Sequence, residues 1–312
     1  MGLASPKSCP TARAGLAPLS DYVRRSGVPA ALSRMSPVRK SAKGVADHLV
    51  YQQIPVNFMD GTSPSLTHFD ELAGDHAYLH CLGLDPRQAV SSHSVKRFVA
   101  GMTGCAARRL RRVLMETFRG TPYRQKPAQV VLDVDTVVYD NDTALVREGC
   151  SPTYKKVKGF QPLMIKWDGI VVWSEFREGK VHSNHGTSVV HALKVLAKMI
   201  REVLGDVRII VTLDKDFAGE LLPFKSFSHN EVWFFLMLIA FNLFELFKQG
   251  CDQLLETSAM YPPTYRRNFI DIAGKIVRHA GKTILKTTVS HYSRLEALWE
   301  FRVPLLTPDN PM

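Results

Sequence analysis

The sequence predicts an α/β protein in which a helical N-terminal region precedes a domain built on a mixed sheet. Apolar residues recur at helical spacing in several short segments between Ala14 and Met115. The pattern changes at Val130, where the segment VVLDVDTVVYD alternates and is rich in β-branched residues. A hairpin, an amphipathic helix and a further strand follow in that order, which is typical of an α/β fold.

The N-terminal region carries signals for the beginnings and ends of helices. Apolar residues at helical spacing predict a helix around Leu19, and Gly27 is expected to end it. Farther along the chain, Ser92 or Ser94 is expected to accept hydrogen bonds from the free backbone amides of a first helical turn. These signals predict several short helices joined by polar loops.

A basic amphipathic helix is predicted in the segment AARRLRRVLMETF. Its arginines surround an apolar stripe, and they are Arg108, Arg109, Arg111 and Arg112. Such a run is either a solvated face or a set of contacts to DNA phosphates. Both interpretations stay open, and the four arginines are candidate DNA-binding residues.

The sheet begins after a linker that contains two prolines and a glycine, which predicts a break between helix and strand. The residues from Val130 to Asp140 predict the first strand. Residues 163–166 and 170–176 predict a hairpin around the turn Trp167-Asp168-Gly169.

An amphipathic helix and an almost wholly apolar strand are predicted after the hairpin. The segment from Thr187 to Leu204 predicts an amphipathic helix that Gly205 ends. Residues 207–214 are almost wholly apolar, and they predict a central strand buried on both faces. The later apolar run from Val232 to Phe244 has about 13 residues, too few to span a bilayer, and predicts a buried helix.

The order strand, hairpin pair, helix, strand is the front half of an RNase H-like α/β sheet. In such a sheet an acid on the first strand and another at the end of the fourth can meet at one site. Asp135 and Asp214 stand at those two places. Asp133 competes with Asp135, because the alternation of a strand puts both on the same face.

Composition and charge narrow the range of partners. An apolar fraction of 45% is ordinary for a globular protein and argues against wholesale disorder. A net charge of +11 and a pI near 9.5 favour polyanionic partners, first nucleic acid and second an anionic membrane, although the protein could simply be basic.

The cysteines and the N-terminus indicate where the chain resides. None of the five cysteines stands at CxxC spacing, so no zinc ribbon or redox motif is predicted, and free thiols fit a reducing cytoplasm. No continuous apolar stretch follows the first basic residues, so no signal peptide is predicted. We expect a cytoplasmic protein, associated with the nucleoid if it binds DNA.

Several stretches together resemble the DDE-type insertion-sequence transposases. VVLDVDT and FQPLMIKWDGIVVWSEFREGKVHSNHG resemble the first half of their catalytic domain, and KSFSHNEVWFFLMLIAFNLFELFKQ resembles its late helix. The segments AGLAPLSDYVRRSG and FIDIAGKIVRHAGK resemble the family's N-terminal region and C-terminal tail. The resemblance implies a helical DNA-binding region over residues 1–120 and an RNase H-like DDE domain over 126–312, interrupted near 214–217.

The resemblance also implies a chemistry and its partners. Asp135 matches the first catalytic acid and Asp214 the second, with Asp133 as a further metal ligand. In the family these acids hold two Mg²⁺ or Mn²⁺ ions that activate an attacking oxygen and stabilise the leaving oxygen. The implied partners are DNA, as the inverted repeats of a mobile element and as target DNA, and a second copy of the chain.

The chain departs from the family after the second acid. The family carries an inserted stretch there, including a helix with the third acid, a glutamate, whereas here VTLD runs almost directly into KDFAGELLPFKSF. Glu220 and Asp216 are the nearest acids, and both are doubtful replacements. Three functions remain: an active transposase, a catalytically dead DNA-binding remnant, or an unrelated nuclease or basic structural protein.

Other polar residues are ambiguous at this level. Lys155, Lys156 and Lys158 lie in a basic loop after the first strand, which either touches DNA phosphates or is solvated. His182 and His185 fit surface groups of a polar loop better than metal ligands. Near the chain end, four further cations are open to either interpretation: Arg266, Arg267, Lys275 and Arg278.

Overall fold

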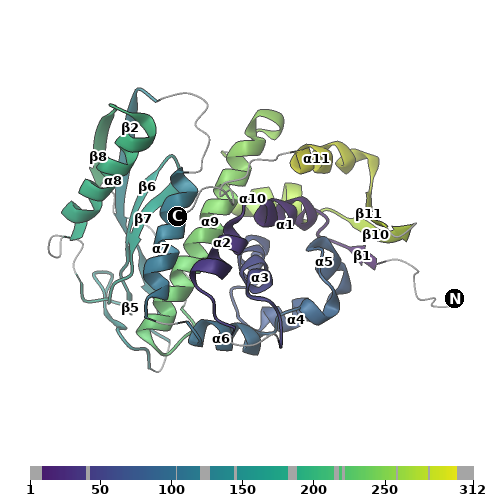
Figure 1. Cartoon of the computed structure of the whole chain (residues 1–312), viewed down its shortest axis with the longest axis horizontal. Coiled ribbons are helices and arrows are strands. Elements are labelled where there is room, and N and C mark those ends of the chain that lie inside the picture. Colours follow the sequence, from purple (N-terminus) through teal and green to yellow (C-terminus); the bar gives the residue numbers. More distant parts are fainter. Residues whose placement is uncertain are drawn as a thin grey trace. The chain divides into compact units, whose positions relative to one another are not determined.

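The computed structural model describes residues 9–39, 43–102, 104–119, 127–143, 146–181, 188–213, 218–219, 222–257, 259–279 and 282–300. The chain forms two compact units (Figure 1). One, here called the split unit, combines Met1–Gly101 with Leu243–Pro311. The other, called the sheet unit, is the continuous segment Met102–Asn242.

Short helices and a small sheet make up the split unit. Its helices before Gly101 are α1 Leu16–Arg25, α2 Val28–Met35, α3 Asp47–Asp60, α4 His68–Gly74, α5 His76–Cys81 and α6 Ser92–Ala100. Later elements are α10 Pro262–Tyr265, β10 Gly274–His279, β11 Lys282–Thr287 and α11 Val289–Glu300. Strand β1 (Cys9–Thr11) pairs antiparallel with β10, so the start of the chain and its late part share one sheet.

Two helix-end predictions can be compared with this unit. Gly27 adopts a left-handed conformation (φ 75°) between α1 and α2, which confirms it as the residue where the first helix ends. The predicted cap of α6 was wrong by one residue. The Ser91 side chain accepts from the Ser94 backbone amide, whereas the Ser92 hydroxyl donates to Asp70.

A mixed sheet of four strands forms the centre of the sheet unit. The strands are β2 Gln129–Thr136, β6 Leu163–Trp167, β7 Ile170–Glu175 and β8 Arg208–Leu213, in the order β7-β6-β2-β8. Strand β6 is antiparallel to both β2 and β7, and β8 is parallel to β2. Asp168 (φ 51°) and Gly169 (φ 77°) form the two-residue turn between β6 and β7, which confirms the predicted hairpin.

A second, smaller sheet continues from the first. The strands are β3 Val138–Asp140, β4 Ser151–Pro152, β5 Lys158–Phe160 and β9 Ala218–Gly219, in the order β4-β5-β3-β9. The predicted first strand is therefore divided at Val137 into β2 and β3. Strand β9 runs parallel to β3, as β8 runs parallel to β2, so the chain after β8 stays alongside the first strand.

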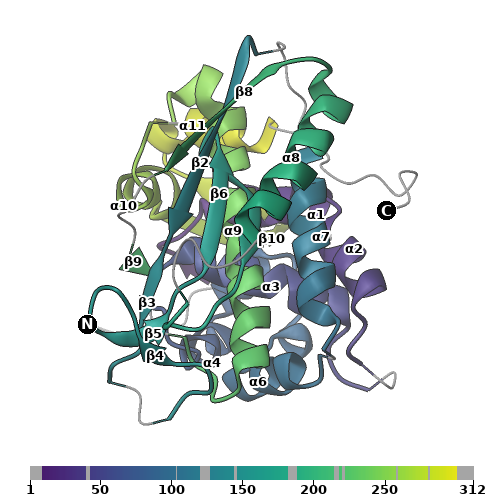
Figure 2. The same cartoon turned by 90° about the vertical axis from the view of Figure 1, so that its left-hand side faces the viewer.

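Two helices cover one face of the larger sheet. The core there brings Val130, Leu132 and Val134 of β2 against Leu196 and Ile200 of α8 (Ser188–Leu204). Phe118 of α7 (Ala106–Arg119) belongs to the same core. Figure 2 shows α7 and α8 on one side of the strands. Both helices were predicted from their apolar spacing, which supplies the side chains of this core.

The position predicted for β8 was wrong. Its apolar sequence predicted a central strand, but β8 is the last strand in the order of the larger sheet among the described residues. Val211 is 43% exposed, and no residue from Arg208 to Thr212 is buried. An apolar run alone does not reveal how many neighbours a strand has, because sheet order is a tertiary property.

The long helix α9 (Phe227–Leu255) contains the apolar run that was predicted to be a buried helix. By length and composition its stretch Phe227–Asp252 is apolar enough to cross a membrane. However, 78% of its most apolar window is buried within the protein, which confirms the prediction of a core helix. Asn242 marks the point where the helix passes from the sheet unit to the split unit.

Candidate carboxylate site and basic surfaces

Strand β2 presents two carboxylates on the face opposite to α7 and α8. Because side chains alternate along a strand, Asp133 and Asp135 point away from the face that carries Leu132 and Val134. Asp135 is 5% exposed, and Asp133 is half-buried. The two predicted acids of the first strand therefore lie on one face, as their spacing required.

A lysine from the neighbouring strand lies beside these acids. Lys166 of β6 is in register with Asp133, and its Nζ lies 3.8 Å from Oδ2 of Asp135. This distance is an ion pair and is too long for a hydrogen bond. The ammonium group offsets part of the charge of a carboxylate that is removed from water.

Asp133 also has a partner on the other neighbouring strand. Thr212 of β8 pairs with Asp133 in the parallel register, and its hydroxyl donates to Oδ1 of Asp133 at 3.2 Å. This hydrogen bond ties the edge strand to the strand that carries the acids. Asp133 and Asp135, two of the three predicted metal ligands, thus each contact a side chain of a neighbouring strand.

The remaining residues predicted for this site lie outside the described residues. They are the second acid Asp214, the doubtful replacements Asp216 and Glu220, and the loop histidines His182 and His185. In the sequence Asp214 directly follows Leu213, the last residue of β8, whose partner in β2 is Val134.

The described residues offer the kind of donor atom that a divalent ion prefers, but too few of them to form a complete site. Carboxylate oxygens are the ligands that Mg²⁺ prefers. Within the described part of the chain, however, no group of three or more His, Cys, Asp or Glu side chains is arranged to hold a metal ion. The ammonium of Lys166 also competes with a cation for Asp135. These residues alone do not complete a two-metal site.

Three of the four arginines predicted for the basic helix are exposed. Arg108, Arg109 and Arg112 lie on the outside of α7, while Arg111 is half-buried. The Arg108 guanidinium donates to the Cys105 thiol at 3.1 Å and holds the pKa of that thiol below its ordinary value. The outer surface of α7 is therefore strongly cationic.

Arg111 turns toward the interior of the sheet unit. Its guanidinium carbon lies 5.4 Å from the ring centre of Trp173 and 5.7 Å from that of Phe235, which are cation–π distances. Burial raises the pKa of the nearby Glu231, and Arg111 opposes that shift. These contacts give Arg111 a structural role that its spacing in the helix did not indicate.

The predicted lysine loop is a hairpin between β4 and β5. Lys155, Lys156 and Lys158 are exposed, and Lys156 adopts a left-handed conformation (φ 62°). The turn is closed by the Thr153 hydroxyl, which donates to the Val157 carbonyl at 2.9 Å. A hydrogen-bonded turn holds the three cations at the surface, where they are accessible to a phosphate backbone.

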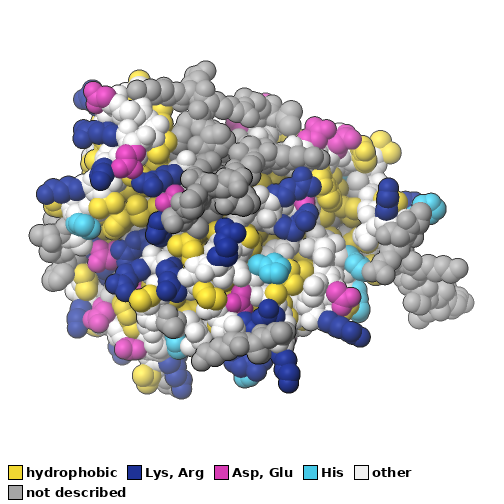
Figure 3. All heavy atoms as spheres, viewed as in Figure 1, with side chains coloured by type: hydrophobic (Ala, Val, Ile, Leu, Met, Phe, Trp, Pro, Cys, Tyr) yellow, Lys and Arg dark blue, Asp and Glu magenta, His cyan; other side chains and the backbone are white. Residues whose placement is uncertain are grey.

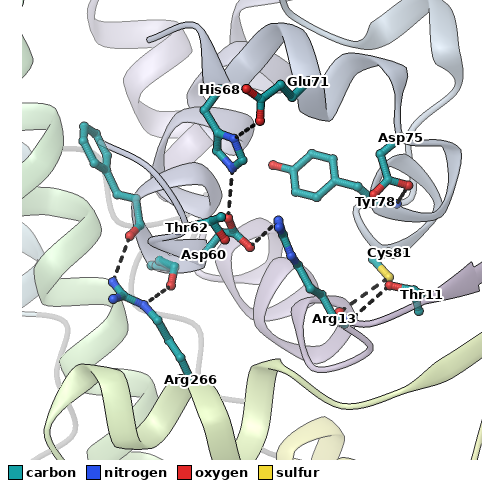
Figure 4. Close-up of polar contacts among 12 residues, drawn as sticks. Thr11, Arg13, Asp60, Thr62, His68, Glu71, Asp75, Tyr78, Cys81 and Arg266 are labelled. Carbon is teal, nitrogen blue, oxygen red and sulfur yellow. Dashed lines mark hydrogen bonds and ion pairs between the residues drawn. The ribbon is translucent and has the colours of Figure 1, made fainter. Parts of the chain in front are cut away.

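A buried ionic network in the split unit was missed by the sequence analysis (Figure 4). Asp60, whose side chain is 1% exposed, accepts from Arg13 at 2.9 Å and lies 3.2 Å from Nε2 of His68. The other ring nitrogen of His68 lies 3.0 Å from Glu71. Arg266 donates to the Met59 carbonyl at 3.2 Å, so this ambiguous cation helps hold the same region.

The network could not be found from local sequence patterns. Arg13 and Asp60 are 47 residues apart, and Arg266 and Met59 are 207 apart. Every polar group named here binds another part of the same unit, which indicates a structural role.

Comparison with known proteins gives one match. The family model described as "Transposase DDE domain group 1" matches residues 47–222, more than half of the chain. Neither the curated proteins nor the solved structures contain a match.

Proposed function

The chain belongs to the transposase DDE domain group 1 family, and from this premise we propose that it is an insertion-sequence transposase that binds DNA but has an incomplete catalytic centre. Members of this family act on DNA, generally with divalent metal ions. The family match covers β2 with Asp133 and Asp135 as well as β8. We assign Asp135 and Asp214 to the first two catalytic acids, with Asp133 as a further ligand.

The strand order supports an RNase H-like core that has been interrupted. The larger sheet uses β2, β6, β7 and β8 as its first to fourth strands in chain order, and their spatial order is third, second, first, fourth. This is the order expected of the front half of that sheet, with β8 in position to receive a fifth strand. We propose that the segment carrying this strand and the third acid is missing after β8.

The observation that carries the proposal is the course of the chain after β8. Only residues 214–217 separate β8 from β9, and β9 stays beside the first strand instead of leading into a further domain. Val211 of β8, the last described strand in the order of the larger sheet, is 43% exposed. An apolar edge with this exposure is what the loss of a neighbouring segment would leave.

A shortage of acids has a direct chemical consequence. Two-metal phosphoryl transfer requires carboxylates that hold both ions beside the attacking and leaving oxygens. The number of charged ligands sets the affinity of a site for a hard cation. A centre without the third acid therefore binds metal weakly. Contacts between lysine or arginine side chains and DNA phosphates do not depend on the third acid.

The domain boundaries belong to the same proposal. We assign DNA binding to the helical region up to residue 120 and the interrupted catalytic domain to residues 126–312, with a second copy of the chain as a further partner. The compact units divide at Gly101 and Asn242, and the family match begins at residue 47. The proposed division by function therefore differs from the division by compactness.

Labelled DNA carrying the ends of the element tests the proposal. The purified chain is incubated with Mg²⁺ or Mn²⁺, and binding and strand cleavage are measured beside Asp135→Ala. We expect salt-sensitive binding by both proteins and cleavage by neither. Cleavage by the unaltered chain that is lost in Asp135→Ala would show that a third ligand is present and overturn the incomplete centre.

The same assay evaluates the alternative of an active transposase. Asp216 and Glu220 follow β8 in the sequence, so Asp216→Ala and Glu220→Ala identify the third ligand if cleavage occurs. Absence of DNA binding in the unaltered, folded chain contradicts both versions of the proposed function.

A further inference from the structure

Helix α8 carries an exposed basic stripe that its sequence pattern did not bring to attention. Lys194, Lys198 and Arg201 are all exposed. Successive helical residues turn by about 100°, so these three fall within a sector of roughly 60°. The sector is opposite to Leu196 and Met199, which pack in the core of the sheet unit. The stripe is therefore the outward face of the helix.

Helix α7 carries a matching stripe. Arg108, Arg112 and Arg119 are exposed and share one outward sector by the same angular argument. The two stripes are connected where Arg119 binds Glu202 of α8 at 2.8 Å. Glu116, the other acid at this end of α7, also binds Arg119 at 3.4 Å. Both carboxylates are thus paired with one arginine, and the other five cations keep the surface positive.

Figure 3 shows Lys and Arg side chains gathered over the part of the molecule where Figure 1 places α7 and α8. This basic helical surface lies on the opposite side of the sheet from the acids. Val130, Leu132 and Val134 face the helices, whereas Asp133 and Asp135 face away from them. A phosphate backbone on the helices is therefore separated from the carboxylates by the thickness of the sheet.

We infer that the outer face of α8 extends the cationic face of α7 into one continuous DNA-binding surface, which holds the phosphates of duplex DNA without presenting them to the acids. The inference rests on the proposed function, because the family membership supplies DNA as the polyanion. The stripe from Lys194 to Arg201 spans about 10 Å, enough for about three phosphates of one strand. Contacts of this kind depend neither on the base sequence of the DNA nor on the catalytic centre.

The side chains around the stripes favour duplex DNA over other polyanions. Binding of single strands uses exposed aromatic side chains as stacking platforms. The large apolar side chains exposed on the described parts of α7 and α8 are Val190 and Val203, and neither is aromatic. Two separated valines also give no continuous apolar face for insertion into a membrane surface.

Salt-dependent binding to a duplex of about 30 base pairs that lacks the element's ends tests the inference. The triple variant Lys194→Gln, Lys198→Gln, Arg201→Gln removes three phosphate contacts. Plotted as log K against log salt, its slope is expected to be shallower by about 2.7, with affinity reduced roughly five-hundredfold at about 0.1 M salt. Thermal melting verifies that the variant is folded.

A matched control changes the net charge equally at another surface. Lys275, Lys282 and Lys286 are exposed on β10 and β11 of the split unit, and their triple change to Gln is expected to leave most of the slope intact. Equal losses in both variants would overturn the inference, because net charge alone would then explain them. An unchanged slope in the α8 variant would also overturn it.

The outcomes separate this inference from the proposed function. If the unaltered chain binds neither this duplex nor DNA carrying the element's ends, both the proposed function and the inference fail. If it binds only the element's ends, the inference alone fails. If it binds duplex and the α8 variant binds equally well, only the inference fails. Tighter binding to phosphatidylserine vesicles or to an RNA hairpin than to duplex, lost in the α8 variant, would assign the surface to a different partner and overturn it.

Discussion

The two edges of the larger sheet differ in how they are covered. At the β7 edge, the Asn242 side chain of α9 accepts from the Val171 amide at 2.9 Å and donates to the Val171 carbonyl at 2.8 Å. All residues of β7 from Ile170 to Ser174 are buried. At the β8 edge, Val211 is 43% exposed and no strand pairs with the outer side of β8 among the described residues.

The two edges differ in whether their outer backbone groups have a partner: those of Val171 in β7 bind Asn242, whereas no described strand pairs with the outer side of β8. An open edge strand pairs readily with other chains, and proteins usually protect it with a covering element or with charge. A buried amide that matches both polar groups of Val171 is such a protection. The apolar β8 edge has no such protection among the described residues.

The largest expected effect is at the protected edge. Asn242→Ala removes the partners of two buried backbone groups, each costing roughly 1–3 kcal/mol when left unsatisfied. We expect the free energy of unfolding to fall by about 3 kcal/mol, measured by urea denaturation. A loss below about 0.5 kcal/mol would mean that water replaces the amide, and the β7 edge would then be no better protected than β8.

Asn230 provides the matched control on the same helix. Its buried side chain accepts from the Phe224 amide at 2.9 Å and donates to the Phe224 carbonyl at 2.8 Å, within one local turn and not at a sheet edge. Asn230→Ala is expected to cost less, because the turn before α9 can open to solvent without opening the sheet. Equal costs would remove the distinction that the sheet edge makes.

A smaller effect on stability is expected at the exposed edge. Val211→Lys places a charge on a side chain that already reaches solvent, so the free energy of unfolding should change by less than about 1 kcal/mol. Self-association, followed by light scattering at increasing concentration, should decrease because an edge lysine opposes strand pairing. Unaltered association would show that another surface joins the copies.

The smallest effect concerns the hydrogen bond between the β8 edge and the acids. Thr212→Val removes the hydroxyl that donates to Asp133 at 3.2 Å. Because the bond is exposed to solvent, the expected loss in urea denaturation is about 0.5 kcal/mol. A loss above about 2 kcal/mol would show that this contact is a principal anchor of β8, and the edge would then be more firmly held than its exposure suggests.

Elements determined by neighbouring residues were predicted well. The turn of the β6–β7 hairpin depends on Asp168 and Gly169, which accept positive φ angles, and Gly27 ends α1 for the same reason. The α7 and α8 helices followed from apolar spacing alone. In each case the signal and the structure it predicts occupy the same few residues.

Features that depend on distant contacts were not predicted. The edge position of β8 follows from which strands pair, and its apolar composition indicated the opposite. The inward turn of Arg111 depends on Trp173 and Phe235, which lie far from it in the chain. For the candidate site, spacing placed Asp133 and Asp135 on one face but did not reveal Lys166, because its contact with Asp135 arises from the register of β6 against β2.

The division of the split unit into two chain segments has a consequence for protein synthesis. Cys9 of β1 pairs with Ile276 of β10, so β1 cannot form its strand pairing until residues made much later have been synthesised. At translation rates of about 5–20 residues per second, the wait is on the order of 10–50 s. During this time the continuous sheet unit emerges whole, while the N-terminal helices lack their late partners. A nascent chain that stops before Gly274 would therefore lack the strand with which β1 pairs. Such an incomplete chain is a natural target for chaperones and proteases.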